Sequence, residues 1–275
     1  MALDQIHEEE EANMSFLDHL EQLRWHLLRS IAAVLVFTII AFLSKSIVFG
    51  TIILGPSKVD FITYRILCSI GNSLNLSALC IEELPFIIQS RQMTGQFSMH
   101  VTSSFVVGII VAFPYLFWEI WRFISPGLHI TERNAARGAV FFVSALFFGG
   151  AAFGYFILSP LSINFLANYQ LDPSILNEFD ITSYVSTLMM LVLASAIMFQ
   201  LPVVIYFLSR SGLVTAAALK AYRRHAIVGI LVIAAVITPP DVISQVLIAM
   251  PILLLYEAGI MIAKRLEKQR REEAL

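Results

Sequence analysis

Residues 237–245 read ITPPDVISQ, two consecutive prolines and an aspartate inside the most apolar part of the chain. The 38 residues 226–263 carry only two charged side chains. A single helix of that length would extend for about 57 Å, well beyond a hydrocarbon layer of about 30 Å. Pro239 and Pro240 lack an N–H group and disfavour helix in the residue before them. The stretch therefore predicts a hairpin bend between two membrane helices, with Asp241 capping the second.

The whole chain has the composition of a membrane protein. Of its 275 residues 58% are hydrophobic and 14% are charged, whereas soluble domains carry about 25% charged residues. Apolar runs lie at about 27–46, 101–121, 137–158, 185–208, 226–238 and 242–263. We therefore predict an all-α integral membrane protein with six transmembrane helices, the fifth and sixth spans being short.

The cations favour one orientation of these spans. With a cytoplasmic N-terminus, 14 of the 18 lysines and arginines fall on the cytoplasmic side and the other four lie in one long outer loop. This asymmetry predicts that both termini are cytoplasmic. We divide the chain into a disordered acidic N-terminus (1–13), a six-span membrane domain (14–266) and a charged cytoplasmic tail (267–275). Helical spacing over 15–28 predicts a short interfacial helix that leads into the first span.

The only two cysteines, Cys68 and Cys80, lie in the long loop after the first apolar run. If this loop is extracytoplasmic they can form a disulfide, and two unpaired thiols are the alternative. Neither their spacing nor their neighbours indicate a metal site, and no pattern indicates a cofactor.

Several polar residues have simple structural explanations. Glu132 can interact with a helix dipole, and Gln200 can join helices by hydrogen bonding. For Asp241, capping of the following helix is by itself a sufficient explanation. Asp241 and Gln245 can alternatively mark a wet, locally thinned region beside the short fifth span, because polar groups inside membranes are commonly functional.

Five motifs occur in order: HLEQLR (19–24), FPYLFWEIWRFISPGL with a later ER (113–133), FGYFILSPLSINFLAN (153–168), FQLPVV (199–204) and TPPDVISQVLIAMPILLLYE (238–257). Together they resemble the TatC family, the polytopic subunit of the twin-arginine (Sec-independent) protein translocase. The resemblance covers about residues 14–266. It implies a concave, cup-like bundle in the bacterial cytoplasmic (inner) membrane.

The resemblance also implies a function. TatC proteins recognise signal peptides with two adjacent arginines and export folded proteins using the proton-motive force. Their partners are single-span TatA-like and, in many systems, TatB-like proteins, membrane lipid and further copies of themselves. They are not enzymes, and no nucleic acid is involved.

Matching to the family's motifs gives two groups of site residues. For signal-peptide binding these are Glu132, Arg24, Phe123 and Pro126. Gln22, at the position of the family's N-terminal acid, and the adjacent Glu21 belong to the same group. For intramembrane or partner contacts they are Pro56, Tyr155, Gln200, Asp241 and Gln245.

The chain departs from the family pattern at two of these positions. The family usually has an acid where Gln22 stands, and here the acid is one position earlier, at Glu21. In a helix, the side chain of Glu21 points about 100° away from that of residue 22. The family often has a glutamate where Gln200 stands, and glutamine holds neither charge nor proton. The first outer loop, about 47–100, is also longer than the family pattern.

Two other classes of membrane protein fit the sequence less well. A secondary transporter for a small solute or ion would suit broken helices near polar residues. However, no inverted repeat is evident. An intramembrane protease would need a catalytic motif, and none is present.

Overall fold

The computed structural model describes residues 16–76, 80–81, 83–124, 136–172, 174–237 and 242–273. In this part the regular secondary structure is helical apart from two three-residue strands. Five helical segments are long and apolar enough to cross a membrane: Glu21–Leu43, Gly95–Phe123, Val140–Asn168, Ile181–Arg210 and Gln245–Arg270. A further apolar helix, α11 (Arg223–Ile237), has 15 residues and extends for about 22 Å. The predicted all-α membrane class is confirmed, and the helix at the fifth position is short.

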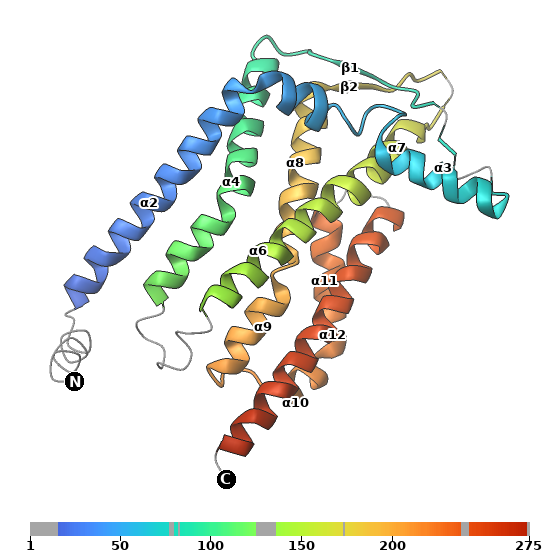
Figure 1. The fold of residues 1–275 in the computed structure, drawn as a ribbon. Helices are drawn as coiled ribbons and strands as arrows, with labels where there is room; N and C mark the ends of the chain where they lie inside the picture. Colours follow the sequence, from blue (N-terminus) through green and yellow to red (C-terminus); the bar gives the residue numbers. More distant parts are fainter. Residues whose placement is uncertain are drawn as a thin grey trace. The chain divides into compact units, whose positions relative to one another are not determined.

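The chain divides into two compact units. Unit 1 contains Met1–Leu43 and Ser104–Ala145, and unit 2 contains Ser44–Ser103 and Leu146–Leu275. Unit 1 pairs α2 (Phe16–Leu43) with most of α4 (Gly95–Ile124), and the two helices lie side by side in Figure 1. The backbone of Gly108 in α4 meets Thr38 of α2 so closely that no side chain would fit between them.

The predicted short interfacial helix is not a separate element. α2 is one uninterrupted helix of 28 residues that contains both the amphipathic segment and the first span. No glycine or proline occurs between residues 16 and 43, and the sequence is rich in leucine, alanine and other good helix formers. Nothing in the sequence therefore ends the helix where the membrane begins.

Unit 2 holds the remaining elements, except that α6 (Ala136–Phe153) belongs to unit 1 as far as Ala145 and to unit 2 from Leu146. Its outer segments are η1 (Ser46–Ile53), a wide helical stretch with i to i+5 hydrogen bonding, α3 (Ile62–Leu74) and β1 (Ile87–Gln89). The third span is made of α6 (Ala136–Phe153), the wide turn η4 (Gly154–Leu158) and α7 (Ser159–Asn168). After β2 (Glu178–Asp180) come α8 (Ile181–Met198), α9 (Leu201–Arg210), α10 (Ala216–Ala221), α11 and α12 (Val242–Glu273).

The fourth apolar run is broken rather than continuous. α8 ends at Met198, a turn passes through Phe199 and Gln200, and α9 begins at Leu201 with Pro202 in its first turn. Pro202 has no N–H to donate to the preceding turn, so the helix is interrupted at this point. The sequence prediction of an unbroken span over 185–208 missed this break.

The sixth helix is long, which corrects the prediction of a short sixth span. α12 has 32 residues and continues into the charged tail. The tail favours helix because Lys268 and Glu272 pair at i and i+4, 3.6 Å apart. It is also held to the body, since Leu266 is buried and the Glu267 carboxylate accepts a hydrogen bond of 2.6 Å from the N–H of Ala216.

Close backbone packing holds α6 against α8. A Cβ on Gly150 would lie 2.7 Å from the carbonyl oxygen of Ser195 and 2.8 Å from the Cα of Ala196. A Cβ on the adjacent Gly149 would meet nothing within 4 Å. The two neighbouring glycines therefore differ in packing while sharing the same helix.

We predict that Gly150→Ala destabilises the protein by roughly 1–3 kcal/mol, because the two backbones must move apart to admit a methyl group. Gly149→Ala is the matched control and should be neutral or slightly stabilising, since alanine is the better helix former. Thermal unfolding in detergent measures both. Equal unfolding temperatures for the two variants would contradict the close packing.

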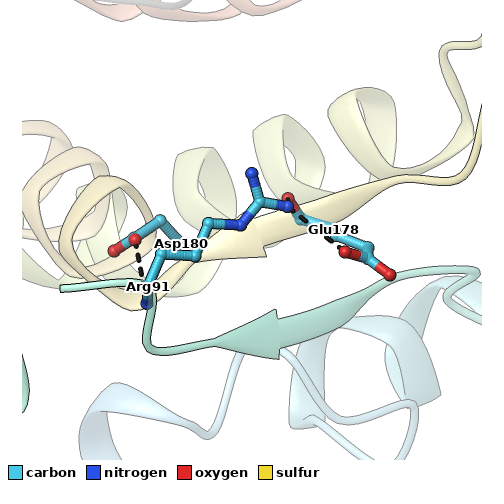
Figure 2. Close-up of polar contacts among 3 residues, drawn as sticks. All are labelled: Arg91, Glu178 and Asp180. Atoms are coloured by element: carbon cyan, nitrogen blue, oxygen red, sulfur yellow. Dashed lines mark hydrogen bonds and ion pairs between the residues drawn. The ribbon is translucent and has the colours of Figure 1, made fainter.

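The two strands join distant parts of the outer segments. β1 pairs in parallel with β2, with Ile88 opposite Phe179. Figure 2 shows Arg91, which follows β1, reaching back to Glu178, with 3.2 Å between its Nη2 and the Glu178 carboxylate. The Arg91 N–H also donates to Asp180 at 3.3 Å.

Asp180 also caps α8. Its Oδ1 accepts from the N–H of Thr182 at 2.8 Å and from the Thr182 hydroxyl at 2.6 Å. The pKa of Asp180 is lowered from its ordinary value, first by the two hydrogen bonds from Thr182 and then by Arg91. A carboxylate whose pKa is lower in the folded state stabilises that state above its ordinary pKa, and this contribution is lost as the pH falls through the folded value.

Asp180→Ala should therefore lower the unfolding temperature at neutral pH, and this difference from wild type should shrink below about pH 3.8, the ordinary carboxyl pKa. Asp180→Asn is the control, because asparagine caps helices without titrating in this range. Unfolding temperatures measured across the acidic range provide the test. An alanine deficit that stayed constant with pH would rule out the charged cap.

Candidate functional site

The predicted recognition residues of unit 1 lie on α2 and at the end of α4. Glu21, Gln22 and Arg24 are exposed on α2, and Phe123 is half-buried in the last turn of α4. Glu132 and Pro126 lie outside the described residues.

A buried hydrogen bond joins these two helices at the same end. The Nδ1 of His26 on α2 lies 2.5 Å from the Oε2 of Glu119 on α4. The Glu119 side chain is 1% exposed and that of His26 is 17% exposed. The His26 ring also meets the Phe123 ring edge-on, with 6.1 Å between centroids. Because breaking a buried pair leaves an uncompensated polar group, this contact fixes how the two helix ends meet.

A cation completes the cluster around Glu119. Arg122, one turn further along α4, places its Nη1 3.9 Å from the Oε1 of Glu119. Its guanidinium also lies over the ring of Trp118, 4.9 Å from the centroid, a cation–π contact. The Glu119 carboxylate is therefore approached from two sides, by His26 and by Arg122.

The helix geometry separates Glu21 from Gln22. Gln22 precedes His26 by four residues and shares its face of α2, whereas Glu21 is rotated away by about 100°. The amide and not the carboxylate consequently lies on the face of α2 that is turned towards α4.

His26, Glu119 and Arg122 are not among the site residues predicted from the sequence. The signal was available, because Glu119 is the only acid between residues 95 and 124, in an otherwise apolar span. An ionisable group in such a position is expected to have a partner. The sequence does not show that this partner lies 93 residues away, at His26.

Two of the residues in unit 2 that were predicted to contact partners lie close together. Tyr155 is hydrogen-bonded to the segment that contains Pro56. The Tyr155 hydroxyl donates to the carbonyl of Ile52 at 2.8 Å, and that of Tyr184 donates to the carbonyl of Ile53 at 2.8 Å. The Tyr64 hydroxyl donates to Pro56 at 3.1 Å. Three tyrosines from three helical elements thus hold residues 52–56, which explains Tyr155 and Pro56 as structural positions.

The other candidates of unit 2 lie on separate elements. Gln200 is half-buried at the α8–α9 break. Its backbone carbonyl accepts hydrogen bonds from the N–H groups of Val203 and Val204 in the first turn of α9. Gln245 on α12 donates to the carbonyl of Leu231 on α11 at 3.1 Å. Asp241 and both prolines of the bend lie outside the described residues. A small apolar pocket near the α8–α9 break is lined by Phe153, Ser195, Met198, Phe199, Ile237, Ile248 and Ile252.

Cys68 and Cys80 are joined in a disulfide, with 4.1 Å between their Cα atoms. Among the described residues, no group of three or more His, Cys, Asp or Glu side chains is placed to hold a metal ion.

These features define a class of protein, a multi-span α-helical membrane protein with a buried histidine–glutamate hydrogen bond between two of its helices. The model of the family "Sec-independent protein translocase protein (TatC)" matches residues 18–251. The chain belongs to the TatC family. It is a protein-translocase subunit that acts in transport and is not an enzyme.

Relatives and solved structures agree along nearly the whole chain. A TatC from Blattabacterium sp. subsp. Periplaneta americana is 38% identical over 95% of this chain and 99% of its own length. A TatC from Halalkalibacterium halodurans is 34% identical over 96% and 97% of the two chains. The crystal structure described as "Twin Arginine Translocase Receptor- TatC in DDM" matches with a TM-score of 0.70, 32% identity and coverage of 89% and 99%. These matches favour a translocase subunit over a secondary transporter for a small solute or ion.

We predict that His26 and Glu119 are energetically coupled. In a double-mutant cycle with His26→Phe and Glu119→Gln, the interaction energy should be on the order of 1–2 kcal/mol, because the two side chains are in direct contact. The measurement is unfolding in detergent of the wild type, both single variants and the double variant. Arg91→Gln combined with Glu119→Gln is the control and should be additive, since Arg91 pairs with Glu178 and Glu119 with His26. Additive effects for His26 and Glu119 would argue against the pair.

Proposed function

We propose that this chain is the signal-peptide receptor of a twin-arginine translocase, and that its receptor surface combines α2 around residues 21–24 with the end of α4 and the segment 125–135. The carrying observation is the buried His26–Glu119 pair. It joins the α2 turn after Gln22 to the α4 turn before Phe123. The segment that begins just beyond Phe123 contains Pro126 and Glu132.

The chemistry of the exposed residues suits two adjacent arginines. A guanidinium is permanently charged and offers a planar fork that a carboxylate can accept through two hydrogen bonds. Glu119 is buried and already in contact with His26 and Arg122, so it acts by positioning the helices. Glu132 then supplies most of the negative charge. Gln22 serves as a neutral acceptor, and Glu21 approaches from another face of α2. Arg24 completes the set carried over from the family.

The orientation that this function needs has two independent supports. The cations are strongly enriched in the segments assigned to the cytoplasm. The Cys68–Cys80 disulfide lies in the first outer loop, and disulfides persist in oxidising compartments such as the bacterial periplasm. Both termini are thus cytoplasmic in the inner membrane, in a six-span bundle with the concave surface expected of the family.

The remaining partners follow from the family. Single-span TatA-like and TatB-like proteins would contact Gln200, at the α8–α9 break, and Gln245, which donates to α11, together with Asp241, which the family match adds to the set. Further copies of the chain would complete the complex, and folded cargo would cross at the expense of the proton-motive force.

We predict that Glu132→Ala weakens photocrosslinking of a twin-arginine signal peptide more than Glu21→Ala does. Loss of a hydrogen bond to a charged group costs about 1.5–3 kcal/mol, so binding should fall roughly tenfold or more for Glu132→Ala. Gln22→Ala should have an intermediate effect. The measurement uses the full chain in membranes, titrated with a signal peptide that carries the photoreactive group.

Two controls accompany this test. A twin-lysine peptide should crosslink weakly to every variant, because an ammonium cannot form the planar double contact. Export of a folded twin-arginine reporter in a strain lacking its own receptor tests the function as a whole. Undiminished crosslinking in Glu132→Ala would refute the assigned roles, and failure of the wild-type chain to support export would refute the receptor function.

A further inference from the structure

Helix α3 in the first outer loop carries an unpartnered apolar stripe. Ile62, Ile66, Ile70 and Leu74 follow one another at intervals of four and are 51%, 53%, 45% and 60% exposed. Each step of four residues turns about 40° around a helix, so the four side chains form a continuous stripe about 120° wide. A surface stripe of this kind on a monomeric chain indicates a contact with something apolar.

The opposite side of α3 already packs on unit 2. Tyr64 is buried, and its hydroxyl donates to the carbonyls of Pro56 at 3.1 Å and Pro160 at 2.8 Å. Gly71 is also buried, and the disulfide ties Cys68 of the helix to Cys80 after it. The helix is therefore held in place by one face while its isoleucine stripe is left uncovered.

The stripe adjoins the lipid-facing surface of the third span. The Thr63 hydroxyl, at one edge of the stripe, donates to the carbonyl of Phe156. Phe61, just before the helix, stacks on the Phe156 ring with centroids 5.9 Å apart. Phe156 and Ile157 are themselves exposed and lie within the span Val140–Asn168. In Figure 1, α3 lies across the direction of α8, as a helix at a membrane surface would.

The charge on α3 has one sign. Arg65 is the only charged residue between 62 and 74, and the oppositely charged Lys58 and Asp60 both precede the helix. A helix with an apolar stripe and a cation on its other side is typical of elements that lie in the membrane interface, where a cation attracts anionic headgroups. We propose that α3 is an interfacial anchor, whose stripe of Ile62, Ile66, Ile70 and Leu74 inserts into the lipid leaflet beside the outer end of the third span. This proposal rests on membrane spanning alone and not on signal-peptide binding.

The test is a depth measurement on the full chain with its disulfide closed. Ile66→Cys and Arg65→Cys, each carrying a nitroxide label, are reconstituted in vesicles of phosphatidylethanolamine and phosphatidylglycerol. Electron paramagnetic resonance then compares relaxation by oxygen, which concentrates in lipid, with relaxation by a water-soluble nickel complex. Residue 66 should show a several-fold higher ratio of oxygen to nickel accessibility than residue 65, and a depth of about 5–10 Å below the headgroups.

Three results would overturn the proposal. Equal nickel accessibility at both positions would mean that the stripe faces water. Protection of residue 66 from both reagents would mean that protein covers it. Protection that disappears when the protein is diluted with lipid would assign the stripe to a second copy of the chain. Peptide mapping confirms that Cys68 and Cys80 remain paired in both labelled proteins, so a misfolded loop is recognised separately.

Discussion

Inside hydrocarbon, a backbone N–H or C=O group without a hydrogen-bond partner costs several kcal/mol, and the structure depends on this constraint. Regular helices meet it internally. Where the helices of unit 2 widen or end, side-chain hydroxyls supply the missing partners. Ser159 donates to the carbonyl of Gly154 at 2.7 Å in the wide turn η4. The tyrosine hydroxyls at 64, 155 and 184 do the same for residues 52–56, where the chain leaves η1. The irregular segments are therefore specified by polar side chains placed at the ends of apolar helices.

The sequence predicts the class of fold because hydrophobic length and charge asymmetry are properties of single segments. Both are large here, so the number of apolar helices and the shortness of α11 could be derived. The break at Gln200 was missed although Pro202 signals it, because the surrounding run is apolar enough to look continuous. The length of α12 was missed for the opposite reason. Its charged end has the composition of a solvated tail, but Leu266 is buried and Glu267 accepts a hydrogen bond from Ala216 of α10. The pairing of β1 with β2 joins segments about 90 residues apart, and three-residue strands carry no readable period.

The candidate site shows the same division. Exposed residues such as Glu21, Gln22 and Arg24 could be proposed from motifs, since motifs record residue types and their order. The contact of His26 with Glu119 is a property of packing between α2 and α4, and no local pattern encodes it. Tyr155 and Pro56 were proposed as partner contacts. The structure gives both a role within the chain, around residues 52–56.

The His26–Glu119 pair also bears on the unusual residue at position 22. A carboxylate there would lie on the same face of α2 as His26, one turn from the residue that contacts the buried Glu119, and neighbouring like charges repel each other. An amide keeps a hydrogen-bond acceptor at that point without adding charge. Glu21, rotated by about 100°, carries its charge away from the pair. The shift of the acid by one position is therefore compatible with a buried glutamate in α4, because the two helix ends can meet without mutual repulsion while an acceptor still faces the end of α4.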